Sequence, residues 1–243
     1  MLEPYLDAAL RRRKQFTVYS TTDEPDITAQ LATRNVTIER KQLSPTGPPP
    51  FVSIRDDGGF VGALGLRDLE QLVSPPIVRP DDQEGLTEGY RALLDVLEET
   101  VFSSLDRGQL LATSREIEDR AQRVGSGALH VTFQSLSAFS SQLERYKRLA
   151  EETNLEIHIH GTPDWSPPAI RNLTYHPDET GSLAEYWCVA FDGGPDPTQA
   201  CVVIAREETD TYVGFWSYDA ELVTNVQRTL ETASADGRNR LTD

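Results

Sequence analysis

The sequence predicts an α/β (α+β) protein with two small mixed β-sheet units and a three-helix segment between them. Short runs rich in β-branched and aromatic residues, each bounded by turn residues, occur near both ends of the chain and are typical of strands. The middle of the chain, residues 86–153, carries apolar residues at the period of a helix. With 243 residues, of which 38% are hydrophobic, the chain can bury a substantial core.

The first unit is expected to be an α/β segment over residues 1–80. Its predicted elements are a helix at 5–14, a strand at 16–20, a helix at 27–33, strands at 36–40, 51–55 and 60–64, and a helical turn at 68–73. The turn Asp56-Asp57-Gly58-Gly59 predicts a hairpin between the last two strands. The run 74–85, rich in proline and acidic residues, is typical of a linker.

The second unit is expected over residues 81–232. Helices are predicted at about 86–103, 106–124 and 128–153, with Gly125-Ser126-Gly127 as the corner between the last two. An α/β part over 154–232 follows, with strands at 155–160, 173–176, 186–191, 200–207 and 211–216 and a helix at 220–232. The tail, residues 233–243, is expected to be disordered.

The two α/β stretches resemble each other, which suggests either an internal duplication or convergent patterning. Residues 5–23 align with residues 146–164 without a gap, and Asn35-Val36-Thr37 corresponds to Asn172-Leu173-Thr174. A true duplication predicts that the two sheets pair about a pseudo-twofold axis, with a groove between them as the ligand site.

The helix at 106–124 has patterned polar residues as well as patterned apolar ones. Its core-facing stripe, at steps of four, three, four and three, consists of Leu110, Ser114, Ile117, Ala121 and Val124. Glu118 falls at the margin of this stripe with Arg115 beside it, which predicts a half-buried charge pair. Such a pair could hold a carboxylate or phosphate ligand, because arginine presents a planar fork of donors, or it could only tie two helices together.

Aromatic residues gather in the strands near the C-terminal end. Trp187, Phe215, Trp216 and Tyr218 could line a flat or apolar ligand pocket, although core packing would explain at least half of them. The candidate ligand-binding residues are therefore Arg115, Glu118, Trp187, Trp216 and Tyr218. No catalytic residue and no metal ligand is assigned, and the sequence names no cofactor.

Five short motifs in a fixed order resemble the DICT family of sensory domains. They are SR-x-IE at 114–118, FQ at 133–134 followed by an aromatic residue, Y-x-RLA at 146–150, WCVAF at 187–191 and FWSYD at 215–219. The resemblance covers roughly residues 90–230 and extends to the stand-alone DICT proteins of halophilic archaea. It implies sensing or regulation in signal transduction. It carries no catalytic residues, and it leaves the ligand open.

The charge composition also favours a halophilic source. The chain has 39 acidic and 23 basic residues, and only Lys14, Lys41 and Lys147 among the basic ones are lysine. A net charge of −16 repels itself in dilute buffer, whereas molar salt shortens the Debye length to about 3 Å and screens it. Acidity together with lysine avoidance favours a halophilic protein over an ordinary acidic one.

Other function classes find little support in the sequence. It contains no Walker loop, no G-x-G-x-x-G, no G-x-S-x-G elbow and no H-E-x-x-H motif, so we expect no enzyme. A basic run at 11–14 is too short to indicate nucleic-acid binding. No apolar run is long enough for a membrane span, and the start lacks the features of a signal peptide, which favours a cytoplasmic protein.

Histidine and cysteine pairs are weak candidates for a site. His158 and His160 lie on one face of a predicted strand with His176 on the next strand, a spacing that could serve a metal but lacks a clear further ligand. Cys188 and Cys201 could lie opposite each other on paired strands, although two buried, inert cysteines are favoured.

The sequence thus predicts a cytoplasmic sensory or regulatory protein that binds a small ligand or a partner protein. The alternatives are a protein-interaction module without a ligand and, less favoured, an uncharacterised enzyme. The partner could be another signalling protein, reached through the apolar faces of the central helices, or a second copy in a homodimer.

Overall fold

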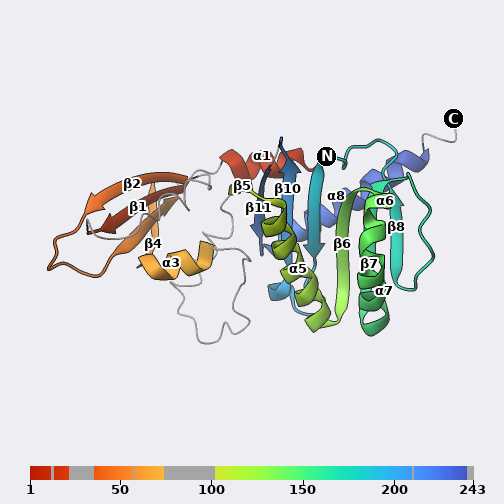
Figure 1. Ribbon diagram of the computed structural model, residues 1–243, viewed down its shortest axis with the longest axis horizontal. Coiled ribbons are helices and arrows are strands. Elements are labelled where there is room, and N and C mark those ends of the chain that lie inside the picture. The colour runs from red at the N-terminus through yellow and green to blue at the C-terminus, as the bar shows by residue number, and fades with distance from the viewer. Residues whose placement is uncertain (12–13, 22–35, 57, 74–101, 210, 240–243) are drawn as a thin grey trace.

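The computed structural model describes residues 1–11, 14–21, 36–56, 58–73, 102–209 and 211–239. Within them the chain forms two separate sheets, flanked by helices, which confirms the α+β class (Figure 1). The predicted helix at 27–33, the linker at 74–85 and the first part of the helix at 86–103 lie outside the described residues. None of the described helices is both long enough and apolar enough to cross a bilayer.

The smaller sheet has the strand order β2-β1-β3-β4, and α3 packs against it. Its elements are β1 Lys14–Ser20, β2 Val36–Gln42, β3 Phe51–Asp56, β4 Gly59–Gly65 and α3 Leu66–Val73. The pair β1–β2 is parallel, and β3 and β4 form the predicted antiparallel hairpin. Its core consists of Phe16, Val18, Val52, Ile54, Leu64, Leu66 and Leu69.

The larger sheet has the strand order β5-β11-β10-β9-β6-β7-β8. Its strands are β5 Phe102–Leu105, β6 Ser126–Ser135, β7 Asn154–Thr162, β8 Leu173–Pro177, β9 Tyr186–Phe191, β10 Cys201–Glu207 and β11 Tyr212–Ser217. Strands β6, β7 and β8 are parallel to one another, whereas β9 pairs antiparallel with β6 and the remaining pairs are antiparallel.

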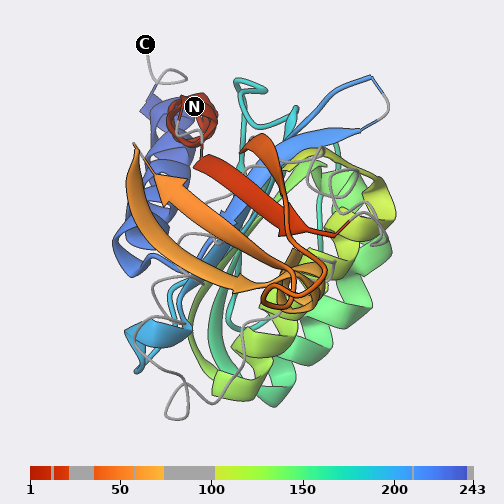
Figure 2. The ribbon, with the colours of Figure 1, turned by 90° about the vertical axis from the view of Figure 1, so that its left-hand side faces the viewer.

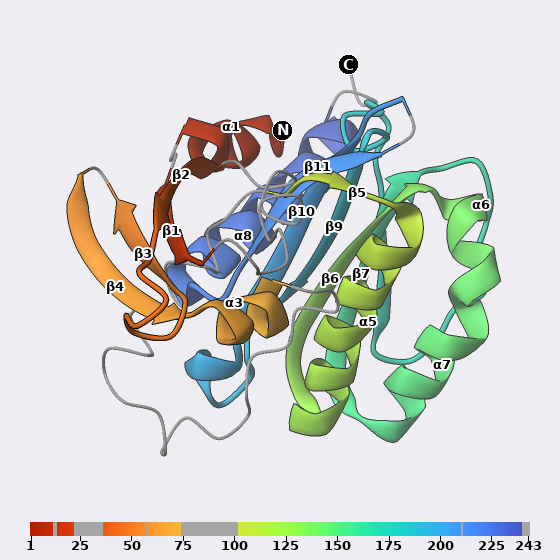
Figure 3. The ribbon, with the colours of Figure 1, turned by 60° about the vertical axis from the view of Figure 1, so that its left-hand side comes forward.

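Helices cover both faces of the larger sheet (Figure 2). One face packs against α5 Arg107–Val124, α6 Leu136–Phe139, the 3-10 turn η1 Ser140–Gln142 and α7 Leu143–Glu152. The other face packs against α1 Glu3–Arg11 and α8 Ala220–Asn239. A short 3-10 turn, η2 Pro197–Gln199, lies between β9 and β10. Figure 3 shows α5 and α7 in front of the strands and α8 behind them.

The three-helix segment predicted between the sheets was wrong at two places. Residues 102–105 form β5, and residues 126–135, placed at the corner and in the helix at 128–153, form β6 in the middle of the larger sheet. The run from Ala128 to Phe133 alternates between the two faces of the sheet, which is the pattern of a strand. Gly125, with φ 75°, ends α5 in the left-handed conformation and turns the chain into a strand, not into a second helix.

Helix boundaries at the two ends of the chain also differ from the prediction. Residues 233–239, expected in a disordered tail, continue α8. Lys14, expected at the end of the first helix, begins β1 and is buried. Helix α1 lies within the predicted N-terminal segment, but it packs against the larger sheet. The core on that face contains Leu6 and Ala9 of α1 and Leu2, which directly precedes the helix.

The arrangement of the sheets departs from a simple duplication. Both sheets contain a parallel pair that follows a helix, β1–β2 after α1 and β7–β8 after α7. In the larger sheet, however, β6 lies between β7 and β9, and among the described residues the smaller sheet has no strand at the matching place in its order. The two sheets form separate hydrogen-bonded units and share no strand edge, and the duplication stays a prediction.

Candidate functional site

Helix α5 positions the charged residues predicted for the site. Its first turn is fixed by a capping box, in which Asp106 accepts from the Gln109 backbone and the Gln109 side chain accepts from the Asp106 backbone. The predicted core stripe is confirmed, since Leu110, Ser114, Ile117 and Ala121 are buried and Val124 is partly buried. The stripe faces the sheet, so Arg115 and Glu118 lie at its edge beside η1 and α7.

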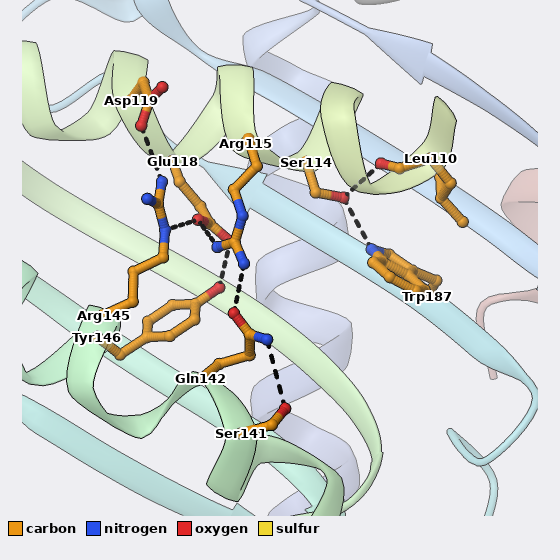
Figure 4. Close-up of polar contacts among 10 residues, drawn as sticks. All are labelled: Leu110, Ser114, Arg115, Glu118, Asp119, Ser141, Gln142, Arg145, Tyr146 and Trp187. Atoms are coloured by element: carbon orange, nitrogen blue, oxygen red, sulfur yellow. Dashed lines mark hydrogen bonds and ion pairs between the residues drawn. The ribbon is translucent and has the colours of Figure 1, made fainter. Parts of the chain in front are cut away.

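Arg115 and Glu118 form the predicted half-buried charge pair. Arg115 Nη1 donates to Glu118 Oε2 at 2.5 Å, and the side chains are 25% and 4% exposed. Two further donors reach the same carboxylate from α7: Arg145 Nε at 2.6 Å and the Tyr146 hydroxyl at 2.6 Å. Arg115 also donates through Nη2 to Gln142 Oε1 of η1 (Figure 4). We call these residues, Arg115, Glu118, Gln142, Arg145 and Tyr146, the Glu118 cluster.

The ionisation of the Glu118 cluster follows from burial and from the Glu118 charge. Burial alone would lower the pKa of Arg145, but the charges and hydrogen bonds of Glu118 and Asp119 together outweigh burial, so the pKa is raised. Burial raises the pKa of Tyr146 well above its usual value, and the nearby Glu118 carboxylate raises it further. Arg145 and Tyr146 therefore stay protonated and continue to donate to Glu118 at neutral pH.

Trp187 is joined to α5 by a short chain of hydrogen bonds. Its indole Nε1 donates to Ser114 Oγ at 2.8 Å, and Ser114 Oγ donates to the Leu110 carbonyl at 3.0 Å (Figure 4). The indole ring also packs edge-on against Tyr212, with the centroids 5.9 Å apart. The partly buried Trp187 is therefore held in one orientation beside the Glu118 cluster.

A pocket of about 120 Å³ lies between α5, the α6–η1–α7 segment and the sheet. Its polar lining includes Arg107, Arg115, Glu118, Gln142 and Tyr146, and its apolar lining includes Leu111, Val131, Phe133, Trp187 and Val189. We call this space the α5 pocket. It brings together three of the five predicted ligand-binding residues, the neighbouring pair Arg115 and Glu118 of α5 and the distant Trp187 of β9.

The other two predicted residues lie away from the α5 pocket. Trp216 is buried in the core, where its ring stacks on Phe102 with the centroids 6.0 Å apart. Tyr218 packs at the edge of the same core, and the Arg120 guanidinium lies 5.3 Å from its ring centroid. Neither residue lines the pocket, because β11 is separated from β6 by β10 and β9.

The cysteines are buried, as favoured, but they do not face each other. Cys188 lies in the core on the α8 side of the sheet, and Cys201 lies in the core on the α5 side. The strand register also pairs Cys188 with Ile204 and Cys201 with Phe191. Burial raises the pKa of both thiols, that of Cys201 to about 12, so neither forms a thiolate near neutral pH.

The structure gathers the predicted histidines with one that sequence reasoning did not select. His158, His160 and His176 lie on the face of the sheet opposite the α5 pocket, and His130 of β6 joins them there. Sequence reasoning missed His130 because it placed this residue in a helix. The alternation of Leu129, Val131 and Phe133 was the signal that could have placed it on a strand.

Comparison with known proteins agrees with the resemblance carried by the motifs. Residues 90–208 match the family model described as DICT, the sensory domain in diguanylate cyclases and two-component systems. Four of the five motifs lie inside this range, whereas FWSYD at 215–219 lies beyond it. No curated protein matches the chain.

Among solved structures, the chain is similar to a polyphosphate kinase from Porphyromonas gingivalis. The likeness has 13% sequence identity and a TM-score of 0.37, and it covers 94% of this chain but only 47% of that one. At this TM-score the likeness carries no argument about fold or activity.

The range 90–208 that matches the DICT family model contains every residue that lines the α5 pocket. This match supports assigning this part of the chain to the DICT family of sensory domains.

Proposed function

We propose that the chain is a cytoplasmic, non-catalytic sensory protein that binds a small ligand in the α5 pocket and signals through a partner protein. The α5 pocket is the observation that carries this proposal, since it joins Arg115, Glu118 and Trp187 in one space of about 120 Å³. A cavity of about 150 Å³ in another protein accepts benzene. The α5 pocket therefore suits a ligand with a single six-membered ring.

The lining of the pocket favours a ring that carries a carboxylate. Val131, Phe133, Val189 and Trp187 supply apolar and aromatic contacts for a flat ring. Arg107 and Arg115 supply positive charge on the α5 side. Glu118 also lines the pocket and pairs with Arg115, so Arg107 supplies the net positive charge that favours an anion in a chain with a net charge of −16.

Arg115 is the residue proposed to respond to the ligand. It shares Glu118 with Arg145 and Tyr146, so it can turn toward a ligand carboxylate while Glu118 keeps two other donors. Arg115 also donates to Gln142 of η1. Its movement would therefore change the link between α5 and the α6–η1–α7 segment, and this outer helical surface is the proposed contact for a signalling partner or a second copy.

The test uses benzoate as the probe and benzamide as its uncharged counterpart, followed by tryptophan fluorescence. We expect benzoate to change the emission of the wild-type protein and of Trp165→Phe, but not of Trp187→Phe, because Trp187 lines the pocket and Trp165 does not. Arg115→Gln should weaken benzoate binding roughly tenfold or more and leave benzamide unchanged, as expected for a charged hydrogen bond. Equal losses for both probes would refute the role of Arg115 in charge recognition. A protein that binds neither probe, with Trp187 unresponsive, would favour the interaction module without a ligand.

We also propose that the protein is adapted to high salt, on the basis of its 39 acidic residues and its three lysines. Lowering KCl from molar concentration to about 0.1 M lengthens the Debye length to about 10 Å, so the repulsion between the negative charges of the chain is less screened. Circular dichroism across this titration should show loss of helix and a lower Tm. An unchanged spectrum and an unchanged Tm would contradict the proposed adaptation to high salt.

A further inference from the structure

All four histidines of the chain gather on one face of the larger sheet. His130 lies on β6, His158 and His160 on β7, and His176 on β8. The strand register places His130 beside His158 and His160 beside His176. The residues between them on these strands, such as Leu129 and Ile159, point into the core on the α5 side. The four imidazoles, which we call the histidine cluster, therefore share the α8 side.

The imidazoles contact one another through hydrogen bonds and ring stacking. His130 Nδ1 lies 3.1 Å from His160 Nε2, and His158 Nδ1 lies 2.9 Å from His176 Nε2. The rings of His130 and His158 stack with their centroids 4.2 Å apart, and those of His160 and His176 stack at 4.5 Å. His130, His160 and His176 are buried, whereas His158 is half-buried.

Each nitrogen pair can be a hydrogen bond only if one nitrogen carries a hydrogen and the other offers a lone pair. A second proton makes both nitrogens donors and puts a positive charge against the neighbouring rings. Burial and the like charge of the neighbours lower the pKa of His130 to about 3 and that of His160 to about 2. Burial also lowers the pKa of His158, although Glu231 and Glu156 oppose this shift.

Helix α8 is the element that covers the histidine cluster. Glu231 of α8 places a carboxylate oxygen 3.8 Å from His130 Nε2, and Glu156 of β7 acts on His158. Glu231 is 56% exposed, so it offers only weak compensation for a buried positive charge. Val223, Val226 and Leu230 of α8 pack in the core of this face, and Gln227 Nε2 donates to the Ala128 carbonyl at 3.0 Å.

We propose that the histidine cluster is a proton-sensitive contact that holds α8 on β6–β8 while its imidazoles are neutral and loosens α8 when the pH falls below about 6.5. At pH values between the ordinary histidine pKa and the lowered pKa values of His130 and His160, the packed state binds fewer protons than the loosened state. Its stability is therefore complete above pH 6.5 and decreases as the pH falls through this window. The device gives the sensory domain a response to acid that is separate from the α5 pocket.

Other titrating groups act outside this window or in the opposite direction. The carboxylates of Glu3, Asp164 and Asp196 have lowered pKa values, so the stability they contribute is lost only below about pH 4. Acidification also reduces the net charge of −16 and relieves repulsion, which by itself stabilises the protein. A loss of stability between pH 7 and pH 5 therefore reports on the histidines.

The test compares the full chain with the double variant His130→Phe/His160→Phe, at constant high salt, between pH 7 and pH 5. The wild-type Tm should fall by roughly 5 °C or more, and amide exchange in α8, corrected for intrinsic rates, should accelerate before exchange in α5. The double variant should show at most half of this fall, whereas Glu156→Gln, which removes a carboxylate that opposes the lowering of the His158 pKa, should show a fall at least as large as wild type. The same fall in wild type and double variant would overturn the proposal.

A second measurement keeps the proposal falsifiable if the double variant does not fold. Histidine NMR signals of the wild-type protein should show His130 and His160 neutral in the packed state at pH 5.5, with charged imidazole appearing only together with loosened α8. Ordinary titration of both residues near pH 6.5 in a fully packed protein would contradict the proposal.

In the described part of the chain no three possible ligands are arranged to hold a metal ion. Stabilisation by equimolar zinc at pH 7.5, lost in the double variant, would overturn the proposal in favour of a metal site.

Discussion

Two buried polar clusters lie on opposite faces of the larger sheet, and they solve the problem of burial in opposite ways. The Glu118 cluster surrounds a buried carboxyl group with three donors, from Arg115, Arg145 and Tyr146. The histidine cluster favours neutral imidazoles, because burial lowers the pKa of His130 and His160, whose rings share hydrogen bonds with their neighbours. The charged cluster is suited to exchange one ion pair for a ligand, whereas the neutral cluster is suited to respond to protons.

The largest expected effect comes from removing the shared carboxylate. Glu118→Leu leaves two guanidinium groups and a buried hydroxyl without their common acceptor, so the free energy of unfolding should fall by about 3–5 kcal/mol. Asp119→Ala is the matched control, since Asp119 contacts Arg145 at 2.8 Å from an exposed position and should cost about 0–1 kcal/mol. Urea unfolding in high salt measures both. Equal losses in the two variants would mean that Glu118 is not the centre of the cluster.

A smaller loss is expected when only one donor is removed. Tyr146→Phe deletes a buried hydroxyl that donates to a charged acceptor, and stability should fall by about 1.5–3 kcal/mol. In Tyr175→Phe the lost hydroxyl donates to the neutral Pro168 carbonyl at 3.0 Å, so the loss should be about 0.5–1.5 kcal/mol. The comparison fails if the Tyr175 variant is the less stable of the two.

The coupling between Arg115 and Glu118 should be smaller than the loss of stability in Glu118→Leu. A double-mutant cycle with Arg115→Met and Glu118→Leu should give about 0.5–3 kcal/mol, because the two side chains share a half-buried ion pair. The pair Arg123–Glu116, at 3.2 Å with 49% and 18% exposed side chains, is the control and should couple by about 0–1 kcal/mol. Coupling below about 0.5 kcal/mol at Arg115–Glu118 would mean that Arg115 acts independently of Glu118.

The sequence was most informative where local patterning and burial agree. Helix α5 follows from its apolar stripe, and β9 was predicted over residues 186–191, its observed bounds, from a run of aromatic and apolar residues, of which five are buried. The half-buried state of Arg115 and Glu118 could be predicted from the helical period alone. Their partners Gln142 and Arg145 could not, because these contacts depend on how η1 and α7 approach α5 in space.

The error at β6 had the widest consequences. The region after Gly125 contains Ala128, Leu129 and Gln134, which are compatible with a helix, and the glycines were interpreted as a corner between helices. Placing β6 in a helix removed an interior strand of the sheet and hid His130, whereas Trp216 and Tyr218 were selected only because aromatic residues gather in the C-terminal strands. Sheet order is a long-range property, so only the assembled fold brings Trp187 to α5 and leaves Trp216 in the core.

Native mass spectrometry of protein purified in high salt tests the ligand-binding role of the α5 pocket most directly. The wild-type protein should retain a small molecule, and Ala138→Trp, which fills the rim of the pocket with a large side chain, should lose it. Lys147→Trp adds the same side chain at an exposed position of α7 that does not line the pocket, and it should retain the molecule. Retention of the same molecule by Ala138→Trp, or no bound molecule in any of the three proteins, would contradict the α5 pocket as the ligand site.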